Sequence, residues 1–225
     1  AEIKIIGPMT DQHSGLHGGA IANPLMALSQ LVASMKDSNG KITIDGFYDD
    51  VLELSDEERA DIARVPYDEE AYIKALKVTG LHGEEGYSTR ERLWARPTLD
   101  VNGIFGGYQG MGSKTVHPSE ASVKITCRLV SNQSPEIIYN LICRHVDKHL
   151  PAGVKSEVRQ LAGSADPFVM PRSHNANQLA RDILEEVYEM EPYVTRLGGS
   201  IPIMTIFLKE LGVYGTMFGF SVGDE

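Results

Sequence analysis

The sequence has few cysteines and little positive charge, and each of these shortages excludes a class of protein. Only two of the 225 residues are cysteines, Cys127 and Cys143, and the formal net charge is -10. Two cysteines do not make the framework of several disulfides that is typical of small secreted proteins, so we expect a reduced, cytoplasmic location. The negative charge also argues against a nucleic-acid partner, because phosphates are held by a basic face.

Long apolar runs are missing as well. No stretch approaches the roughly 20 apolar residues that cross a membrane, and no charged-then-apolar leader stands at the beginning. We therefore expect a soluble protein with no membrane partner. The chain begins at Ala1 and ends at Glu225 directly after an apolar run, so both ends look as if they had been cut from a longer protein.

Polar residues and glycines are concentrated in the stretch from Thr10 to Gly19. It contains His13 and lies between a strand-like run, 3–6, and a helix that opens at Asn23 and Pro24. A flexible polar corner between two regular elements is typical of a binding loop. The same residues also fit an ordinary turn in which His13 only satisfies local backbone groups, and composition does not decide between the two.

Hydrophobic periodicity divides the first part of the chain into strands and helices. In chain order we expect a strand at 3–6, a helix at 24–36, a short strand at 41–44, an acidic insertion of short helices at 46–96 (helical spacing at 54–65 and 69–76), strands at 99–102 and 121–129, a helix at 134–149 and a strand at 154–161. This order predicts a two-layer α+β sandwich, β-α-β-β-α-β, over residues 1–162, with two helices on one sheet face. Arg128 is expected on the solvent face of its strand.

The rest of the chain has a different pattern. Residues 163–172 indicate a linker. A helix at 177–188, a strand at 193–196, a helix at 201–211 and an apolar strand at 214–222 then alternate as in a doubly wound α/β layer. Two strands are too few for a sheet of their own, so we expect residues 163–225 to be part of a larger α/β domain.

Two pairs of residues could hold a metal on their chemical types alone. Glu84 and Glu85 could supply a ligand and a general base, but they lie in an insertion rich in acids, where a solvated loop is the simpler interpretation. His145 and His149 are one helical turn apart and could face a metal together. Lys148 is adjacent and no zinc-protease pattern surrounds them, so a surface helix end is favoured.

Arg128 and Thr115 could together bind a carboxylate. A guanidinium holds a carboxylate through two parallel hydrogen bonds, and a hydroxyl adds a third donor. The segment Gly198–Pro202 lies where a predicted strand meets a predicted helix, so free N–H groups at Gly199 and the Ser200 hydroxyl would form an anion site. Considered singly, Arg128 and Thr115 are each more often ordinary exposed residues.

Seven segments, taken in order, carry a resemblance that no single segment would support. They are Asp11–Gly15, Gly18–Gly19 with Asn23–Pro24, Gly46–Val51, Arg96–Leu99, Gly112–Val116, Arg128–Val130 and Gly198–Pro202. Together they make the chain resemble the co-catalytic metallopeptidases that include carnosine dipeptidase, aminoacylase and carboxypeptidase G, with the dipeptidase branch favoured. The resemblance implies a catalytic α/β domain with two bridged zinc ions, or manganese or cobalt, and an inserted lid domain that forms a homodimer.

On this resemblance, residues 1–162 are the lid and residues 163–225 are the C-terminal part of the catalytic domain. His13 would enter an active site, commonly that of the neighbouring subunit, and stabilise the oxyanion. Thr115, Arg128 and Ser200 would bind the C-terminal carboxylate of a small peptide. The family's metal-ligand motifs are absent from this chain, and Glu84 and Glu85 do not correspond to its catalytic pair.

The leading hypothesis is therefore part of a metal-dependent dipeptidase or related aminoacyl hydrolase. This chain would supply the oxyanion and carboxylate-binding residues and would be inactive by itself. The alternative, from another class of protein, is a dimerisation and ligand-binding module without catalysis.

Overall fold

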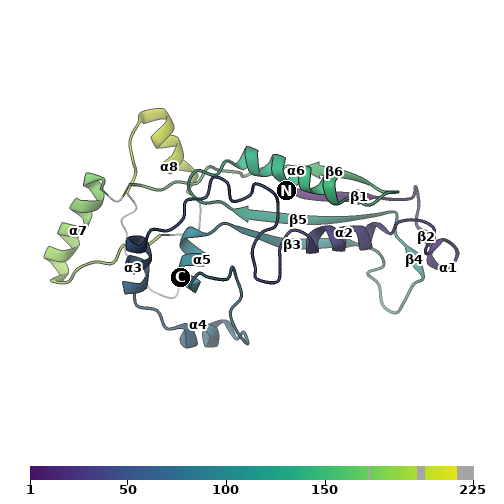
Figure 1. Cartoon of the computed structure of the whole chain (residues 1–225), viewed down its shortest axis with the longest axis horizontal. Helices are drawn as coiled ribbons and strands as arrows, with labels where there is room; N and C mark the ends of the chain where they lie inside the picture. Colours follow the sequence, from purple (N-terminus) through teal and green to yellow (C-terminus); the bar gives the residue numbers. More distant parts are fainter. Residues whose placement is uncertain (172, 197–200, 217–225) are drawn as a thin grey trace.

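The computed structural model describes residues 1–171, 173–196 and 201–216, and a four-stranded antiparallel sheet lies at its centre (Figure 1). The strands and their two long helices are β1 (Glu2–Ile6), α2 (Pro24–Ala33), β3 (Thr98–Gly106), β5 (Glu120–Arg128), α6 (Pro135–His149) and β6 (Lys155–Arg159). The strand order in the sheet is β3-β5-β1-β6. The expected β-α-β-β-α-β sandwich is confirmed, and β3 and β6 are its two edges.

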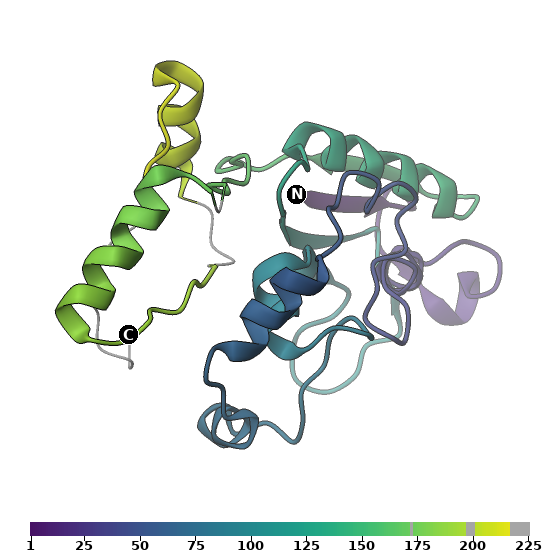
Figure 2. The same cartoon turned by 60° about the vertical axis from the view of Figure 1, so that its left-hand side comes forward.

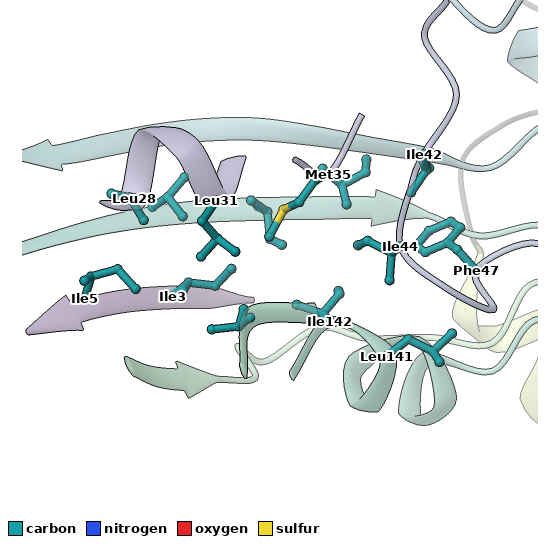
Figure 3. Packing of buried hydrophobic residues seen from close by; sticks show 14 of the residues in the cluster. Ile3, Ile5, Leu28, Leu31, Met35, Ile42, Ile44, Phe47, Leu141 and Ile142 are labelled. Atoms are coloured by element: carbon teal, nitrogen blue, oxygen red, sulfur yellow. The ribbon is translucent and has the colours of Figure 1, made fainter. Parts of the chain in front are cut away.

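Helices α2 and α6 share one hydrophobic core with the strands (Figure 3). Helix α2 begins where expected, because Pro24 opens it and the Asn23 side chain accepts the N–H of Leu25 at 2.9 Å. Its Leu28 and Leu31 pack against residues of β1 and β5. Both helices lie on one face of the sheet, and neither covers the other face.

Strand β5 shows the alternation that its sequence predicts. Ala121, Val123 and Ile125 are buried, whereas Lys124 and Arg128 are exposed. Since successive side chains of a strand point to opposite faces, Arg128 lies on the face that the two helices leave open.

The acidic insertion folds into three short helices, α3 (Asp56–Arg64), α4 (Glu69–Leu76) and α5 (Thr89–Ala95). Helices α3 and α4 confirm the helices predicted at 54–65 and 69–76. Helix α5 was not among the predicted helices. Its beginning is marked by a capping box, in which the Ser88 N–H donates to Glu91 at 2.6 Å and the Ser88 hydroxyl accepts from the Glu91 N–H. This local signal was present in the sequence.

A largely buried ion pair inside the insertion joins the end of α5 to the loop before it, and the Glu85 N–H of that loop donates to the Asn39 carbonyl of the sandwich at 3.0 Å. The Arg96 guanidinium donates to both carboxylate oxygens of Glu84, at 2.9 and 2.8 Å, and the two side chains are 5% and 11% exposed. The guanidinium also lies 4.3 Å from the ring centroid of Tyr87 and 5.0 Å from that of Tyr48. The interpretation of Glu84 as part of a solvated loop is therefore wrong, because a buried guanidinium needs a carboxylate partner.

Two strand predictions in the first part of the chain need correction. Residues 41–44 form no strand; Ile42 makes a single bridge to Lys36 across a tight turn. Its backbone bonds, from the Thr43 N–H to the Met35 carbonyl and from the Asp37 N–H to the Lys41 carbonyl, each at 2.9 Å, stay within this turn, and the segment joins neither sheet. The strand expected at 99–102 continues to Gly106 with a register shift between Val101 and Gly103, so the glycine-rich bend begins later than predicted.

The C-terminal part contains helix α7 (Asn175–Tyr188) and helix α8 (Pro202–Ile206), which continues as a π-helix, Phe207–Leu211 (Figure 2). Both helices were expected. The strand prediction at 193–196 is wrong: no other segment of the described chain lies beside it to complete a ladder. Residues 214–216 are also not a strand, and 217–222 lie outside the described residues. No helix in the described ranges is long and apolar enough to span a membrane.

Removing the buried guanidinium should destabilise the protein strongly. Arg96→Ala leaves the Glu84 carboxylate buried without a charged partner, so we expect a loss of about 3 kcal/mol in the free energy of unfolding. Urea unfolding followed by fluorescence measures it.

The matched control breaks an exposed ion pair. Lys148 bonds Asp45 at 2.6 Å with side chains 61% and 80% exposed, and Lys148→Ala should cost less than about 1 kcal/mol. Equal losses in the two variants would contradict the importance of the buried pair.

Candidate functional site

A two-stranded ribbon at one end of the sandwich brings His13 to Thr115. The ribbon pairs β2 (Gln12–His13) with β4 (Val116–His117) and is followed by the one-turn helix α1 (Ser14–His17). The Ser14 N–H extends the ladder by donating to the Thr115 carbonyl at 3.1 Å. Two residues that are 102 positions apart in sequence thus lie side by side. We call the ribbon with α1 the tip (Figure 1).

The His13 ring has a partner at each nitrogen and remains exposed to solvent. Its Nδ1 accepts the Gly15 N–H at 3.0 Å, and its Nε2 lies 3.2 Å from the Thr115 Oγ1. With Nδ1 acting as acceptor, the neutral ring carries its proton on Nε2. In this geometry the Nε2–H donates to the Thr115 Oγ1, and a ligand at this exposed pair can receive the Nε2 proton by replacing the hydroxyl as its acceptor.

Asp11 fastens the tip to the sandwich. Its Oδ1 accepts the Ser119 N–H at 2.8 Å, one residue before β5 begins. That hydrogen bond lowers the pKa of the Asp11 carboxyl below its ordinary value. The group is therefore ionised at neutral pH, and the tether is lost only when acid takes the pH through that lowered pKa.

Arg128 lies at the opposite end of β5 from the tip. Its side chain is exposed on the open sheet face, and its cross-strand neighbour is Thr98. Within the described residues Arg128 makes no ion pair, so its guanidinium is available to an anion.

The structure does not bring Thr115 and Arg128 together within one chain. Strand β5 runs from Glu120 to Arg128, and an extended strand rises about 3.3 Å per residue, so its ends are about 26 Å apart. Figure 1 shows the tip at one end of β5 and the C-terminal helices beyond the other. The predicted anion-binding residues Gly199 and Ser200 lie outside the described residues.

The chain just before that predicted anion site is joined to the insertion. Arg196 donates to Glu58 of α3 at 2.6 Å, and Arg64 of α3 donates to Glu191 at 2.6 Å. Both ion pairs link segments more than 100 residues apart in sequence. The insertion thus contacts both the sandwich and the segment that leads to Gly199.

A family model described as the peptidase dimerisation domain matches residues 1–154. The chain belongs to the M20 peptidase family. It is 32% identical over 228 residues to the Cys-Gly metallodipeptidase of Candida albicans, covering 100% of this chain and 47% of that protein. It is 28% identical over 201 residues to the Beta-Ala-His dipeptidase of Rattus norvegicus, covering 88% and 40%.

A solved structure agrees with these relatives. An M20 family metallo-carboxypeptidase from Sulfolobus solfataricus matches with a TM-score of 0.78 and 30% identity, over 95% of this chain and 55% of that one. The resemblance read from the sequence motifs is confirmed. The chain spans about half the length of the curated relatives it matches.

Membership of the M20 family implies metal ions, but the described residues do not form a site for them. No group of three or more His, Cys, Asp or Glu in this part of the chain could hold a metal. His145 and His149 stack with ring centroids 4.0 Å apart. None of the described residues is therefore assigned to a metal.

His145 is not at a surface helix end, and that expectation is wrong. It is 4% exposed, and its Nε2 lies 2.9 Å from the Ser34 Oγ at the end of α2. The hydroxyl provides the hydrogen bond that lets the ring be buried. Burial, with a smaller contribution from His149, lowers the pKa of His145 and favours the neutral ring.

Sequence reasoning missed the contacts that build the tip. The sequence singles out His13 but does not predict its bonds to Gly15 and Thr115 or the bond from Ser119 to Asp11. The Gly15 contact is local, and a histidine two residues before a glycine at a helix start was an available signal. The contacts to Thr115 and through Asp11 depend on long-range pairing, for which a single sequence has no local signal.

Loosening the Asp11 tether should open the tip. We expect Asp11→Ala to speed amide hydrogen exchange in β2 and β4 roughly three- to tenfold, because the carboxylate bond to Ser119 is lost. Exchange followed by mass spectrometry on peptides covering both strands measures this. Asp37 makes comparable bonds to the N–H groups of Asn39 and Lys41, each at 2.9 Å, so Asp37→Ala is the control that should leave the tip unchanged.

Proposed function

We propose that the full-length protein is a metal-dependent dipeptidase or related aminoacyl hydrolase and that this chain supplies residues that bind the substrate. The relatives named above are a Cys-Gly metallodipeptidase and a Beta-Ala-His dipeptidase. The observation that carries the proposal is the exposed, hydrogen-bonded pair of His13 and Thr115. A substrate with a free C-terminal carboxylate and a scissile amide presents the acceptors that the His13 Nε2–H and an unpaired guanidinium would bind.

Each residue has a distinct role in this proposal. When substrate binds, the His13 Nε2–H exchanges the Thr115 Oγ1 for the carbonyl oxygen of the scissile amide and stabilises the negative charge that develops there. Arg128, with Thr115 and the predicted N–H and hydroxyl groups at Gly199 and Ser200, binds the carboxylate and fixes the register of the peptide. The metal ions implied by the family, two zinc or alternatively manganese or cobalt, would activate the attacking water when bound.

The length of β5 supports a site built from two chains. A dipeptide is far shorter than the roughly 26 Å between the ends of this strand. One chain therefore cannot apply its His13 and its Arg128 to the same substrate. A homodimer that places the tip of one subunit at the Arg128 end of the other would complete two such sites.

The edge strand β3 suits such a homodimer. A two-fold axis across an antiparallel edge exchanges the ends of the two sheets, which is the required arrangement. Strand β3 is nine residues long and exposes Val101, Ile104 and Phe105, at 44%, 49% and 54%. The other edge, β6, has five residues, three of them charged and exposed, which is how sheet edges are kept from pairing.

We also propose a reduced compartment such as the cytoplasm. Cys127 and Cys143 are both free. Burial raises the pKa of the Cys127 thiol to about 11, so it stays protonated and is a poor nucleophile.

The second candidate is a dimerisation and ligand-binding module without catalysis. It is favoured by the match of residues 1–154 to a dimerisation domain and by the lack of a metal cluster among the described residues. Metal analysis and a dipeptidase assay on the full-length protein separate the two. A metal-free, inactive full-length protein would exclude the dipeptidase proposal.

Subunit mixing tests whether the site is shared between chains. His13→Asn keeps a side chain that can cap α1 but removes the Nε2 donor, so kcat should fall by about a hundredfold. Arg128→Ala should chiefly raise KM for dipeptides. The two variants are unfolded and refolded together and assayed at a substrate concentration well below KM, where both are impaired. About half of the dimers are mixed and each has one complete site of two, so about a quarter of the wild-type rate should return.

The controls are each variant refolded alone and the double variant mixed with wild type. If His13 and Arg128 act within the same chain, mixing the single variants restores nothing. That result would overturn the shared site while leaving the dipeptidase activity itself intact.

A charge on the β3 edge should separate the subunits. Ile104→Lys places two lysines near each other across the two-fold axis and should shift the protein toward monomer, with loss of dipeptidase activity. Sedimentation velocity and the assay measure both effects. Glu157→Lys, on the exposed face of the β6 edge, is the control, and dissociation by Glu157→Lys alone would assign the interface to β6.

A further inference from the structure

The His13 ring is held by a backbone group two residues away. The Gly15 N–H donates to Nδ1 at 3.0 Å. This bond occupies the Nδ1 lone pair, so the neutral ring presents a proton on Nε2 toward Thr115 and the solvent. The donor that the proposed reaction uses is thus selected by a hydrogen bond at the other side of the ring.

Gly15 also leaves the space that the ring occupies. A Cβ built on Gly15 would lie 3.0 Å from Cε1 and 3.1 Å from Nδ1 of His13. Carbon atoms normally approach no closer than about 3.5 Å, so a side chain at this position would push the ring by a few tenths of an ångström.

Helix capping alone does not explain the glycine. His174 caps α7 in the same way, with its Nδ1 accepting the Ala176 N–H at 3.2 Å. A histidine cap therefore tolerates a Cβ two residues later. Aspartate, asparagine and serine are the preferred N-caps, but serine has a single polar atom, and the second polar atom of the shorter aspartate and asparagine does not reach as far from the backbone as the histidine Nε2.

We infer that Gly15 is a positioning residue, which fixes the tautomer and the place of the His13 ring through its N–H and through its lack of a side chain. The inference rests on the oxyanion role proposed for His13. Gly15 does not touch the substrate; it acts only through the ring.

The first test is Gly15→Ala in the full-length protein assayed with added Zn²⁺ or Mn²⁺. A small displacement of a transition-state donor should lower kcat by about tenfold and leave KM within about twofold. Gly80→Ala is the control, because a Cβ there meets no atom within 4 Å. Melting temperature and sedimentation verify that both variants remain folded and dimeric.

The second test separates positioning from general damage to the tip. In a His13→Ala background there is no ring to position, so adding Gly15→Ala should produce no further fall in kcat. A tenfold fall that persists in this background would assign Gly15 a merely structural role and overturn the inference.

The outcomes distinguish this inference from the proposed function. An unchanged kcat in His13→Ala would remove His13 from the reaction, and Gly15 with it. A large fall in His13→Ala with an unchanged kcat in Gly15→Ala would overturn the positioning role alone. A further variant covers the case in which Gly15→Ala lowers the melting temperature. Replacing Gly15 by glycolic acid deletes only the backbone N–H, and we expect the same fall in kcat as for Gly15→Ala.

Discussion

Nine residues of extended backbone in β5 hold the two groups of candidate substrate-binding residues apart. The tip, with His13 and Thr115, is attached before the strand begins, and Arg128 stands at its end. An antiparallel strand paired on both sides cannot shorten, because each step would break ladder hydrogen bonds. The division of the site between two subunits is the direct consequence that we propose for this rigid separation.

The buried pair of Arg96 and Glu84 holds the insertion together from within. It joins the end of α5 to the loop before it, and an ion pair with so little exposure is costly to break. The same loop bonds Asn39 of the sandwich, and α3 bonds the segment before Gly199. The insertion thus contacts both neighbouring parts of the chain, although its acidic composition suggested a solvated appendage.

Much of the sandwich could be predicted because its signals are local. Asn23 and Pro24 mark the beginning of α2, and the alternation from Ala121 onward identifies β5 and its open face. The strand predictions failed at segments whose structure depends on whether another strand pairs with them. Residues 41–44 and 193–196 have the composition of strands, but the first makes only one isolated bridge and the second joins neither sheet of the described chain. Strand propensity without a paired strand does not make a sheet.

The sequence by itself determined the caps, the periodic helices and strands, and the membership of the M20 family, because each depends on residue types at short or ordered spacings. Only the tertiary structure decided that His13 meets Thr115, that Asp11 fastens the tip and that Arg128 is remote from both. These relations depend on which strands pair and in what register. The packing of the whole core decides which strands pair. Bringing distant segments together costs loop-closure entropy, and the contacts of the folded core must compensate for that cost.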